Sequence, residues 1–227
     1  GDVTLYDYDS QGNLISETNH YSDTVAYTYN QFGQRASVTD ENGVTTQFGY
    51  DAWGQMRVIT DALNRTSHFE YDVIGRLITS TDTVGRVTVN EYDGGNNLIR
   101  VIENIHPTVT TQNYLELYNI VTEYEYDGVG NQTAVTNTVG QVERFFFDEA
   151  GRVVTHVVNY TATLPLCDFN QPQSQYNICN LTAYDGLGRV EATTDNIGRI
   201  ERTFYDDKGQ VAGIVKNWTG AIASAAD

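Results

Sequence analysis

Short runs in which apolar and polar residues alternate, separated by turn-forming residues, fill most of the chain. Between Phe69 and Asp93, an alternating run leads into Asp-Val-Ile-Gly, and a second run leads into Asp-Thr-Val-Gly and a third strand-like segment. Alternation with a period of two places one set of side chains on each face of a β-strand. The pattern therefore predicts an all-β fold of antiparallel hairpins joined by tight turns, with little or no helix.

The same pattern recurs with a period of 21 residues, interrupted only by two longer spacings of 34 and 37 residues. A fixed period of this length is the signature of a repeat protein. Each copy contains a leading aromatic residue, and most copies contain a second aromatic residue two positions earlier, on the same strand face. We therefore expect the rings to stack as a buried aromatic core. The leading aromatic residues are Tyr8, Tyr29, Tyr50, Tyr71, Tyr92, Tyr126, Phe147, Tyr184 and Tyr205.

The residue after the leading aromatic is usually Asp, and a Gly usually stands three residues after that Asp. An Asp carboxylate can accept hydrogen bonds from the amides of its own turn, and Gly readily adopts positive φ. The pattern predicts a type I turn with a bulge at the glycine. A second turn with a similar sequence closes each repeat at the opposite edge. The predicted structural turn residues are Asp9, Gly12, Asp51, Gly54, Asp72, Gly75, Asp127, Gly130, Asp185, Gly188, Asp206 and Gly209.

Both breaks in the period fall at the second turn, as insertions at about residues 104–122 and 159–181. Insertions at one edge leave a stack of hairpins intact, so we predict a single repeat array over residues 1–227 with a degenerate tail at 217–227. The terminal strands carry no polar cap. We expect them to pair with copies of the chain or with adjoining repeats of a longer chain.

Thirty acidic and 13 basic residues give the chain a net charge of −17. This charge repels phosphate backbones and anionic lipid headgroups, so no nucleic-acid partner is expected. No apolar run approaches the roughly 18 residues of a membrane-spanning helix, so we also expect no membrane insertion.

The sequence contains no pattern that predicts catalysis or metal binding. The turn aspartates lack the ligand spacing of a calcium loop, and their role in the turns is sufficient to explain them. The histidines His20, His68, His106 and His156 lie far apart. Neither a nucleophile elbow nor a phosphate-binding glycine loop is present. A sugar-stacking or base-stacking role for the aromatic residues is less consistent with their fixed register than a core role. We therefore expect no cofactor and no enzymatic activity.

Cys167 and Cys179, the only cysteines, both fall in the second insertion. A disulfide that closes this loop is favoured over two free thiols, would stabilise the fold by about 3 kcal/mol, and would indicate an oxidising environment. The sequence also contains Asn-x-Ser/Thr acceptors for N-glycosylation. These candidate sites are Asn64, Asn131, Asn159, Asn180 and Asn217.

The sequence Tyr-Asp-x-x-Gly-Arg-Leu at Tyr71 to Leu77, with a variant at Tyr184 to Val190, resembles the YD repeat of Rhs proteins, wall-associated bacterial proteins, insecticidal toxin-complex subunits and teneurins. The resemblance covers nearly the whole chain. It implies hairpins that wind into a spiralling sheet or shell-like β-solenoid. Rhs and toxin-complex members close such a shell with a self-cleaving core segment and enclose a toxic C-terminal domain, whereas teneurins use it as an extracellular interaction scaffold. We find neither a core segment nor a cargo domain in residues 1–227.

These observations favour a non-catalytic structural scaffold at the cell surface or in a secreted assembly, with insertion loops available for protein or glycan contacts. In one version of this hypothesis the chain polymerises into a fibre. The alternative is a section of an Rhs or toxin-complex shell that encloses a toxic cargo domain. A carbohydrate-binding or hydrolytic module is a third possibility, which rests only on Tyr and Asp residues in the insertions.

Overall fold

The computed structural model describes residues 2–105, 118–167, 169 and 175–219, and these residues form strands, turns and loops without any helix. All 18 strands belong to one antiparallel sheet, which confirms the predicted all-β fold of hairpin repeats. The strands are β1 Leu5–Tyr8, β2 Leu14–Thr18, β3 Thr24–Tyr29, β4 Arg35–Thr39, β5 Thr45–Tyr50, β6 Met56–Thr60, β7 Thr66–Tyr71, β8 Leu77–Thr81, β9 Val87–Tyr92, β10 Leu98–Glu103, β11 Ile120–Tyr126, β12 Gln132–Thr136, β13 Val142–Phe147, β14 Val153–Val158, β15 Ile178–Tyr184, β16 Val190–Thr194, β17 Ile200–Tyr205 and β18 Val211–Lys216.

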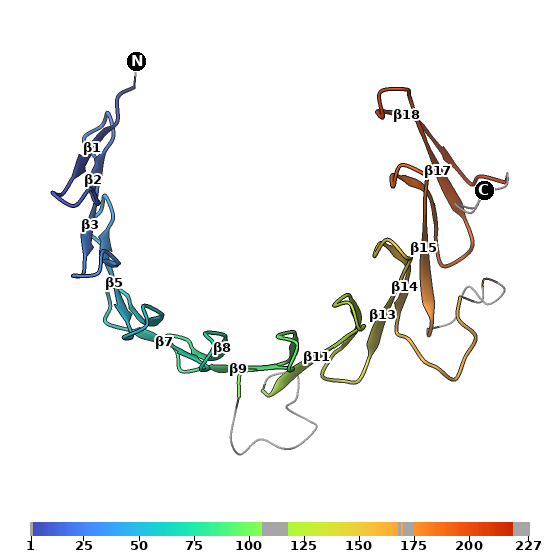
Figure 1. The fold of residues 1–227 in the computed structure, drawn as a ribbon, viewed down its shortest axis with the longest axis horizontal. Helices are drawn as coiled ribbons and strands as arrows, with labels where there is room; N and C mark the ends of the chain where they lie inside the picture. Colours follow the sequence, from blue (N-terminus) through green and yellow to red (C-terminus); the bar gives the residue numbers. More distant parts are fainter. Residues whose placement is uncertain (1, 106–117, 168, 170–174, 220–227) are drawn as a thin grey trace. The chain divides into compact units, whose positions relative to one another are not determined.

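The chain divides into two compact units. The first contains residues 1–91 and 101–120, and the second contains residues 92–100 and 121–227. Within each unit, consecutive strands pair with one another in chain order, so the topology is a meander of hairpins (Figure 1). Successive first turns therefore lie along one edge of the sheet, and successive second turns lie along the opposite edge.

Each first turn is closed by hydrogen bonds within five residues. In the turn that begins at Asp72, the Asp72 amide donates to the Arg76 carbonyl over 2.9 Å, and the Gly75 amide donates to the Asp72 carbonyl over 3.0 Å. The Asp72 Oδ1 atom also accepts the amides of Ile74 and Arg76, each over 3.0 Å. Gly75 has a φ of +93°, a conformation that glycine adopts without steric cost. The second turns use the same bonds, as the turn from Asp82 shows.

Return strands of the first-turn hairpins contain an extra residue that the sequence analysis did not predict. Tyr71 pairs with Leu77, but Glu70 pairs with Thr79, so Ile78 has no partner in the ladder. Such a bulge bends the strand and increases its local twist. The bulged residues are Ile15, Ala36, Arg57, Ile78, Thr133, Val154, Glu191 and Ala212.

Beside the bulge, the leading tyrosine of one hairpin binds the backbone of the hairpin before it. The ladder between β2 and β3 extends from Ser16 to Thr18 and does not reach Leu14, the residue just before the bulge. The Tyr29 hydroxyl donates to the Leu14 carbonyl over 2.8 Å and so satisfies an acceptor outside the ladder. We call this contact the tyrosine clamp. Further clamps join Tyr50 to Arg35, Tyr126 to Leu98, Tyr184 to Val153 and Tyr205 to Val190, over 2.8–3.0 Å.

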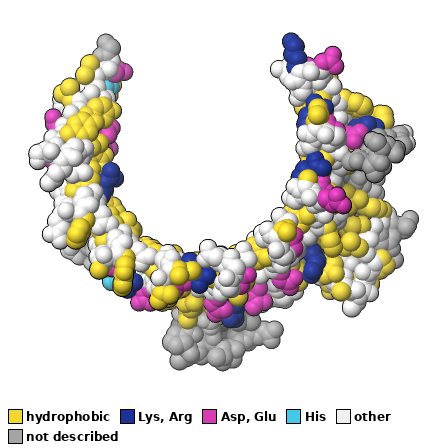
Figure 2. Space-filling model, in the orientation of Figure 1, with side chains coloured by type: hydrophobic (Ala, Val, Ile, Leu, Met, Phe, Trp, Pro, Cys, Tyr) yellow, Lys and Arg dark blue, Asp and Glu magenta, His cyan; other side chains and the backbone are white. Residues whose placement is uncertain are grey.

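The leading rings do not form the buried core that the sequence predicted. Tyr8 is 60% exposed, and the other leading aromatic residues are half-buried. Among the described residues, the buried hydrophobic side chains are instead Ala134, Val157, Cys179 and Ala192. The reason is that every described strand lies in the same sheet, so most of each face has no second layer against it. Figure 2 shows hydrophobic side chains at the surface beside polar ones.

The turn aspartates are held as carboxylates by their hydrogen bonds. The Asn131 side-chain amide donates to Asp127 Oδ2 over 2.8 Å, and the Asn131 and Val129 backbone amides donate to Oδ1. These bonds, that of the Asn131 side chain foremost, lower the pKa of Asp127 below its ordinary value. At Asp148, the Arg152 side chain is the main cause of a lowered pKa, followed by the Arg152 backbone amide. The pKa values of Asp9, Asp61, Asp72, Asp82, Asp185 and Asp195 are also lowered.

The tyrosine clamp predicts opposite effects for two substitutions. Tyr205→Phe removes the hydroxyl that binds the Val190 carbonyl, so the free energy of unfolding should fall by about 1 kcal/mol. Phe147→Tyr adds a hydroxyl where the matching acceptor, 15 residues earlier, is the Gln132 carbonyl, so stability should rise by up to about 1 kcal/mol. Urea unfolding measures both effects, and Tyr21→Phe at an exposed turn is the control. A clamp role is contradicted if Phe147→Tyr destabilises the protein.

The lowered aspartate pKa values predict a loss of stability in acid. Because the native pKa lies below the unfolded one, the contribution of each carboxylate is fully present above about pH 4 and is lost as the pH falls through the native pKa. The urea midpoint should therefore drop as the pH falls from about 5 to about 2, the range in which these carboxylates take up protons. Asp127→Asn should flatten this dependence, since Asn30 already serves the same turn position.

Candidate functional site: the disulfide-closed insertion

Both insertions begin and end at asparagines with positive φ. In the second insertion these are Asn159 and Asn177, with φ of +53° and +50°, and the Asn177 amide donates to the Asn159 carbonyl over 3.1 Å. In the first insertion, Asn119 donates in the same way to Asn104 over 3.1 Å. Asn is one of the few residues that tolerates this backbone conformation. The paired asparagines bring the two ends of each insertion together, so the strands on either side remain neighbours.

We call the first asparagine of each insertion its entry asparagine. In both insertions, the residue after the entry asparagine donates a backbone hydrogen bond to an earlier strand. The amides of Ile105 and Tyr160 donate to the carbonyls of Val87 and Val142, over 3.0 and 2.7 Å. At the end of β18, Asn217 has a φ of +54° and the Trp218 amide donates to the Ile200 carbonyl over 2.8 Å. The tail that the sequence analysis called degenerate therefore starts with the entry geometry of an insertion. Residues 220–227 and most of the first insertion, including His106, lie outside the described residues.

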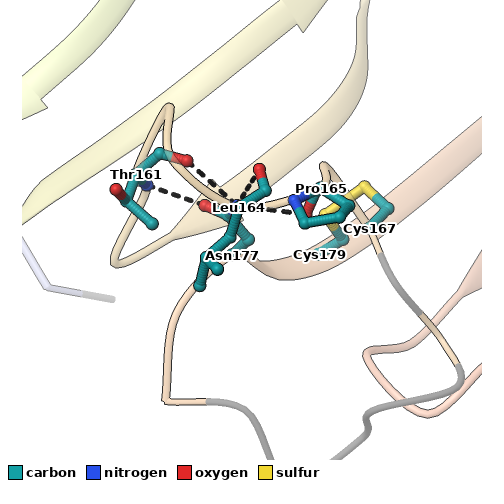
Figure 3. The surroundings of a disulfide bond; sticks show 6 residues. All are labelled: Thr161, Leu164, Pro165, Cys167, Asn177 and Cys179. Carbon is teal, nitrogen blue, oxygen red and sulfur yellow. Dashed lines mark hydrogen bonds between the residues drawn. A yellow bond between two sulfur atoms is a disulfide. The ribbon is translucent and has the colours of Figure 1, made fainter.

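Asn177 organises the described part of the second insertion (Figure 3). Its Nδ2 atom donates to the carbonyls of Thr161, Leu164 and Pro165 over 3.0, 3.2 and 3.1 Å. Its Oδ1 atom accepts the Thr161 amide over 2.7 Å. Among the described residues, Asn177 is the polar residue that is classed as buried, with 8% of its surface exposed. A buried amide with this many partners fixes the path of the loop rather than offering free groups to a substrate.

The insertion is also linked covalently to the sheet. Cys167 in the loop and Cys179 in β15 form a disulfide, with their Cα atoms 5.3 Å apart. Cys179 pairs across the ladder with Val157, which pairs on its other side with Arg144, which in turn pairs with Ala134. The Arg144 guanidinium lies 5.1 Å from the centre of the Tyr160 ring. The loop thus lies over a row that contains three of the four buried hydrophobic side chains.

Phe169 extends this contact to the following repeat. A Cβ atom added to Gly198 would lie 3.5 Å from the Phe169 Cβ, so the Phe169 side chain packs against the second turn between β16 and β17. Gly198 has a φ of +79°, as the turn requires. The described part of the insertion therefore contacts one face of several neighbouring strands and acts as a local cover for the sheet.

The structure gives some of the candidate glycosylation asparagines other contacts. The Nδ2 atoms of Asn131 and Asn159 donate to Asp127 Oδ2 and to the Gln175 carbonyl. A glycan on either nitrogen would have to preserve or replace that bond. Asn64 lies in a second turn with a φ of +58°, and it is exposed, as are Asn180 and Asn217.

The described residues do not bring together a group of three or more metal-ligating side chains. His156 lies 3.0 Å from Glu143 Oε2 and stacks on Phe145, while His68 Nε2 lies 3.0 Å from Thr66 Oγ1. The protein's two cysteines are joined in the disulfide. The described part of the chain forms no helix and so contains no helical membrane span. The geometry of the insertion is that of a structural or contact element.

The sequence analysis found the cysteines and the position of the insertion but missed Asn177, because the partners of a buried amide cannot be read from spacing. A signal for the entry asparagines was present. Asn159 and Asn217 are each followed by an aromatic residue and then by threonine. The triplet Asn-aromatic-Thr comes directly after a strand in both places. It marks the point where the chain departs from the ordinary second turn.

A family model described as RHS Repeat matches residues 8–45, 29–66, 50–87 and 121–162, which together cover more than half of the chain. The chain matches no curated protein sequence.

Among solved structures, the chain is similar to one titled "Crystal Structure of TcdB2-TccC3-Cdc42", with a TM-score of 0.72 and 18% identity over 96% of this chain. It is also similar to the structure of a Photorhabdus luminescens Tc holotoxin pore, with a TM-score of 0.70 and 18% identity over 96% of this chain. In both cases this chain spans only 12% of the length of the other chain. At these identities the similarity shows a shared fold.

The contacts of Asn177 predict the effect of replacing it by aspartate. Asn177→Asp substitutes a carboxylate for the amide that donates to three carbonyls, so like partial charges would face one another in a buried site. We expect the free energy of unfolding to fall by about 2–3 kcal/mol and the Thr161 amide to lose protection from hydrogen exchange. Asn180→Asp makes the same chemical change at an exposed position and should alter neither property. Equal protection of Thr161 in both variants would contradict the role of Asn177.

Proposed function

Because this chain belongs to the RHS-repeat family, as its resemblance to YD repeats indicated, we propose that it is a section of the wall of a larger RHS-repeat shell that encloses a cargo domain. The observation that carries the proposal is the similarity of 96% of the chain to 12% of a chain in the TcdB2-TccC3-Cdc42 structure. Nearly every residue corresponds to one short stretch of a much longer chain. The whole segment is then wall, and any cargo would lie elsewhere in the protein.

The construction of the sheet suits a wall. Each hairpin is closed by its own turn bonds and joined to the previous hairpin by a short ladder, to which a tyrosine clamp is added at several hairpins. Hairpins of this kind can be added one after another without a central core, because each one contacts only its neighbours. The few fully buried side chains of the described residues are consistent with a thin layer rather than with a compact enzyme domain. We therefore propose a structural, non-catalytic role for this segment.

The proposed partners are adjoining repeats of the same assembly. Two of the similar structures contain the named components TcdB2 and TccC3 together, which supports assembly with an adjoining segment or chain. The disulfide between Cys167 and Cys179 supports an oxidising location, because such bonds persist mainly in secreted and surface proteins. The second insertion, held over one face of the sheet, is the described element that differs most from the plain repeat and is suited to specific contacts.

An extracellular scaffold without cargo is the second candidate, and the disulfide is the observation that favours it. The two candidates share the same sheet and differ in whether it surrounds another domain. The comparisons support the shell better, because the similar structures are toxin complexes. A fibre formed through terminal strands is the version of the scaffold that is easiest to test.

The test is to express the complete reading frame that contains this segment and to examine the purified protein by electron microscopy and limited proteolysis. A shell predicts discrete hollow particles in which one domain resists protease until the wall is unfolded. A matched variant, Tyr126→Phe with Tyr205→Phe, weakens two clamps and should expose the domain at lower urea concentrations. Extended fibres, or particles with no protected domain, would overturn the shell and favour the scaffold.

A further inference from the structure

The return strand before each insertion is one residue longer than the return strand before an ordinary second turn. Six residues form each of β10, β14 and β18, and five form each of β2, β4, β6, β8, β12 and β16. An ordinary second turn starts 11 positions after the leading aromatic residue, as Asp82 does after Tyr71, whereas both entry asparagines lie 12 positions after theirs. Asn217 also lies 12 positions after Tyr205, so β18 has the length of a strand that leads into an insertion.

An insertion keeps one hydrogen bond of the turn that it replaces. In the ordinary second turn from Asp82, the Gly85 amide donates to the Asp82 carbonyl over 3.0 Å, and Gly85 has a φ of +84°. In the second insertion, the Asn177 amide donates to the Asn159 carbonyl, and both Gly85 and Asn177 stand seven positions before the next leading aromatic residue. An entry asparagine is therefore one half of a pair, whose other half is a residue of positive φ at the start of the next strand.

The aromatic residue after the asparagine lies over an arginine in the same way at β14 and β18. The Trp218 amide donates to the Ile200 carbonyl over 2.8 Å, and Arg202 follows two positions later on β17. The Arg202 guanidinium lies 5.1 Å from the centre of the Trp218 ring, the same distance as between Arg144 and Tyr160. Stacking of this kind is strongest where water is excluded. Trp218 thus occupies the place that Tyr160 has at the start of the second insertion.

One polar atom beside β18 is buried without a partner. Phe204 meets Trp218 edge-on, with ring centres 5.7 Å apart, and Arg202 forms an ion pair with Glu191. The Trp218 Nε1 atom in this cluster is buried and has no hydrogen-bond acceptor in the described part of the chain. A buried indole N–H normally donates to an acceptor. The cluster is therefore suited to an oxygen atom from a segment that lies against it.

β18 is uncovered where β14 is covered. Val157 of β14 pairs with Arg144, and Val215 of β18 pairs with Arg202. Val157 is 0% exposed beside β15 and under the second insertion, but Val215 is 40% exposed. The ladder of β18 runs along β17, and its other edge is suited to a further antiparallel strand (Figure 1). A strand there, with a loop above it, would bury Val215 as Val157 is buried.

We propose that Asn217 and Trp218 begin a third insertion, and that they form, with β18, the attachment surface for the next repeat of the same protein. The returning segment contributes a residue of positive φ, as asparagine does in both described insertions, and its amide donates to the Asn217 carbonyl. The strand that follows pairs with β18 and covers Val215, and the segment supplies an acceptor for the Trp218 indole. The inference rests on the proposed shell wall, because it requires a longer array of repeats, and it identifies the partner of one edge.

The geometry selects the same chain over a second copy. The second insertion is one segment that leaves β14 and returns to pair with it as β15, and its ends are joined by the two asparagines. The strands that follow the two insertions, β11 and β15, contain seven residues each, whereas β1 contains four. The first strand of a second copy therefore matches β18 less well than a strand that follows an insertion.

The complete reading frame gives the first test. An ordinary turn would place the next leading aromatic residue 21 positions after Tyr205, where the sequence has Ala226. We expect the next Tyr-Asp pair at a spacing like the 34 and 37 residues of the described insertions, with asparagine or glycine seven positions before the tyrosine. A reading frame without a further repeat would overturn the attachment surface.

Hydrogen exchange of the peptide that spans β18, followed by mass spectrometry, gives the second test. Exchange should be slower by about tenfold or more in the full-length protein than in the 227-residue chain, because the next strand accepts the outward amides of β18. In the full-length protein, Trp218→Ala should restore most of the fast exchange. Trp218→Tyr should preserve the protection, since tyrosine holds this place in the second insertion. Trp53→Ala, at an exposed turn, is the matched control and should leave β18 protected.

The outcomes separate this inference from the shell wall. Equal exchange of β18 in the two proteins would overturn the attachment surface, as would protection in the 227-residue chain that grows with its concentration, which would indicate a second copy. Either result leaves the shell wall standing if hollow particles with a protected domain are observed. Conversely, a protected β18 in a protein that forms no such particles would support the attachment surface and reject the shell.

Discussion

The hydrogen bond from a leading tyrosine to a carbonyl of the preceding hairpin supports the arrangement of the hairpins wherever the leading residue is one of the clamp tyrosines. Within a hairpin, the turn and ladder bonds connect residues that are close in sequence. Between hairpins, the ladder is short, as the three pairs from Ser16 to Thr18 show. The Tyr29 hydroxyl adds a bond beyond the end of that ladder, at the Leu14 carbonyl. This contact explains why the repeat favours tyrosine at a position where phenylalanine would cover almost the same area.

The clamp also explains why the chain tolerates long insertions at the second turn. In a plain repeat it joins residues 15 positions apart, and it joins Tyr126 to Leu98 and Tyr184 to Val153 across separations of 28 and 31. The asparagine pairs at the ends of each insertion bring the neighbouring strands together, so the clamp keeps its geometry. The loop between the asparagines can then vary without disturbing the repeat. In the second insertion, the disulfide and Asn177 give that loop a fixed path of its own.

A thin sheet built in this way leaves side chains uncovered on its faces and at its turns, and the proposed functions follow from that exposure. In the proposed shell, enclosure of cargo covers one face of the sheet. The turn aspartates in this sheet stay ionised, because the bonds of their own turns stabilise the carboxylates. Asp72, for example, accepts two backbone amides and the Arg76 side chain.

The sequence by itself determined the hairpins, their turns and the family. These features arise from interactions within about five residues, such as those of Asp72 and Gly75, and from a period that repeats them. It also limited the disulfide to one pair, because the chain contains only Cys167 and Cys179. Only the tertiary structure decided that most leading rings stay half-buried, that return strands such as β8 bulge, and that Asn177 is buried under the second insertion. Alternation shows which side chains share a face but not whether anything covers that face, and the acceptor of a tyrosine hydroxyl lies in another hairpin.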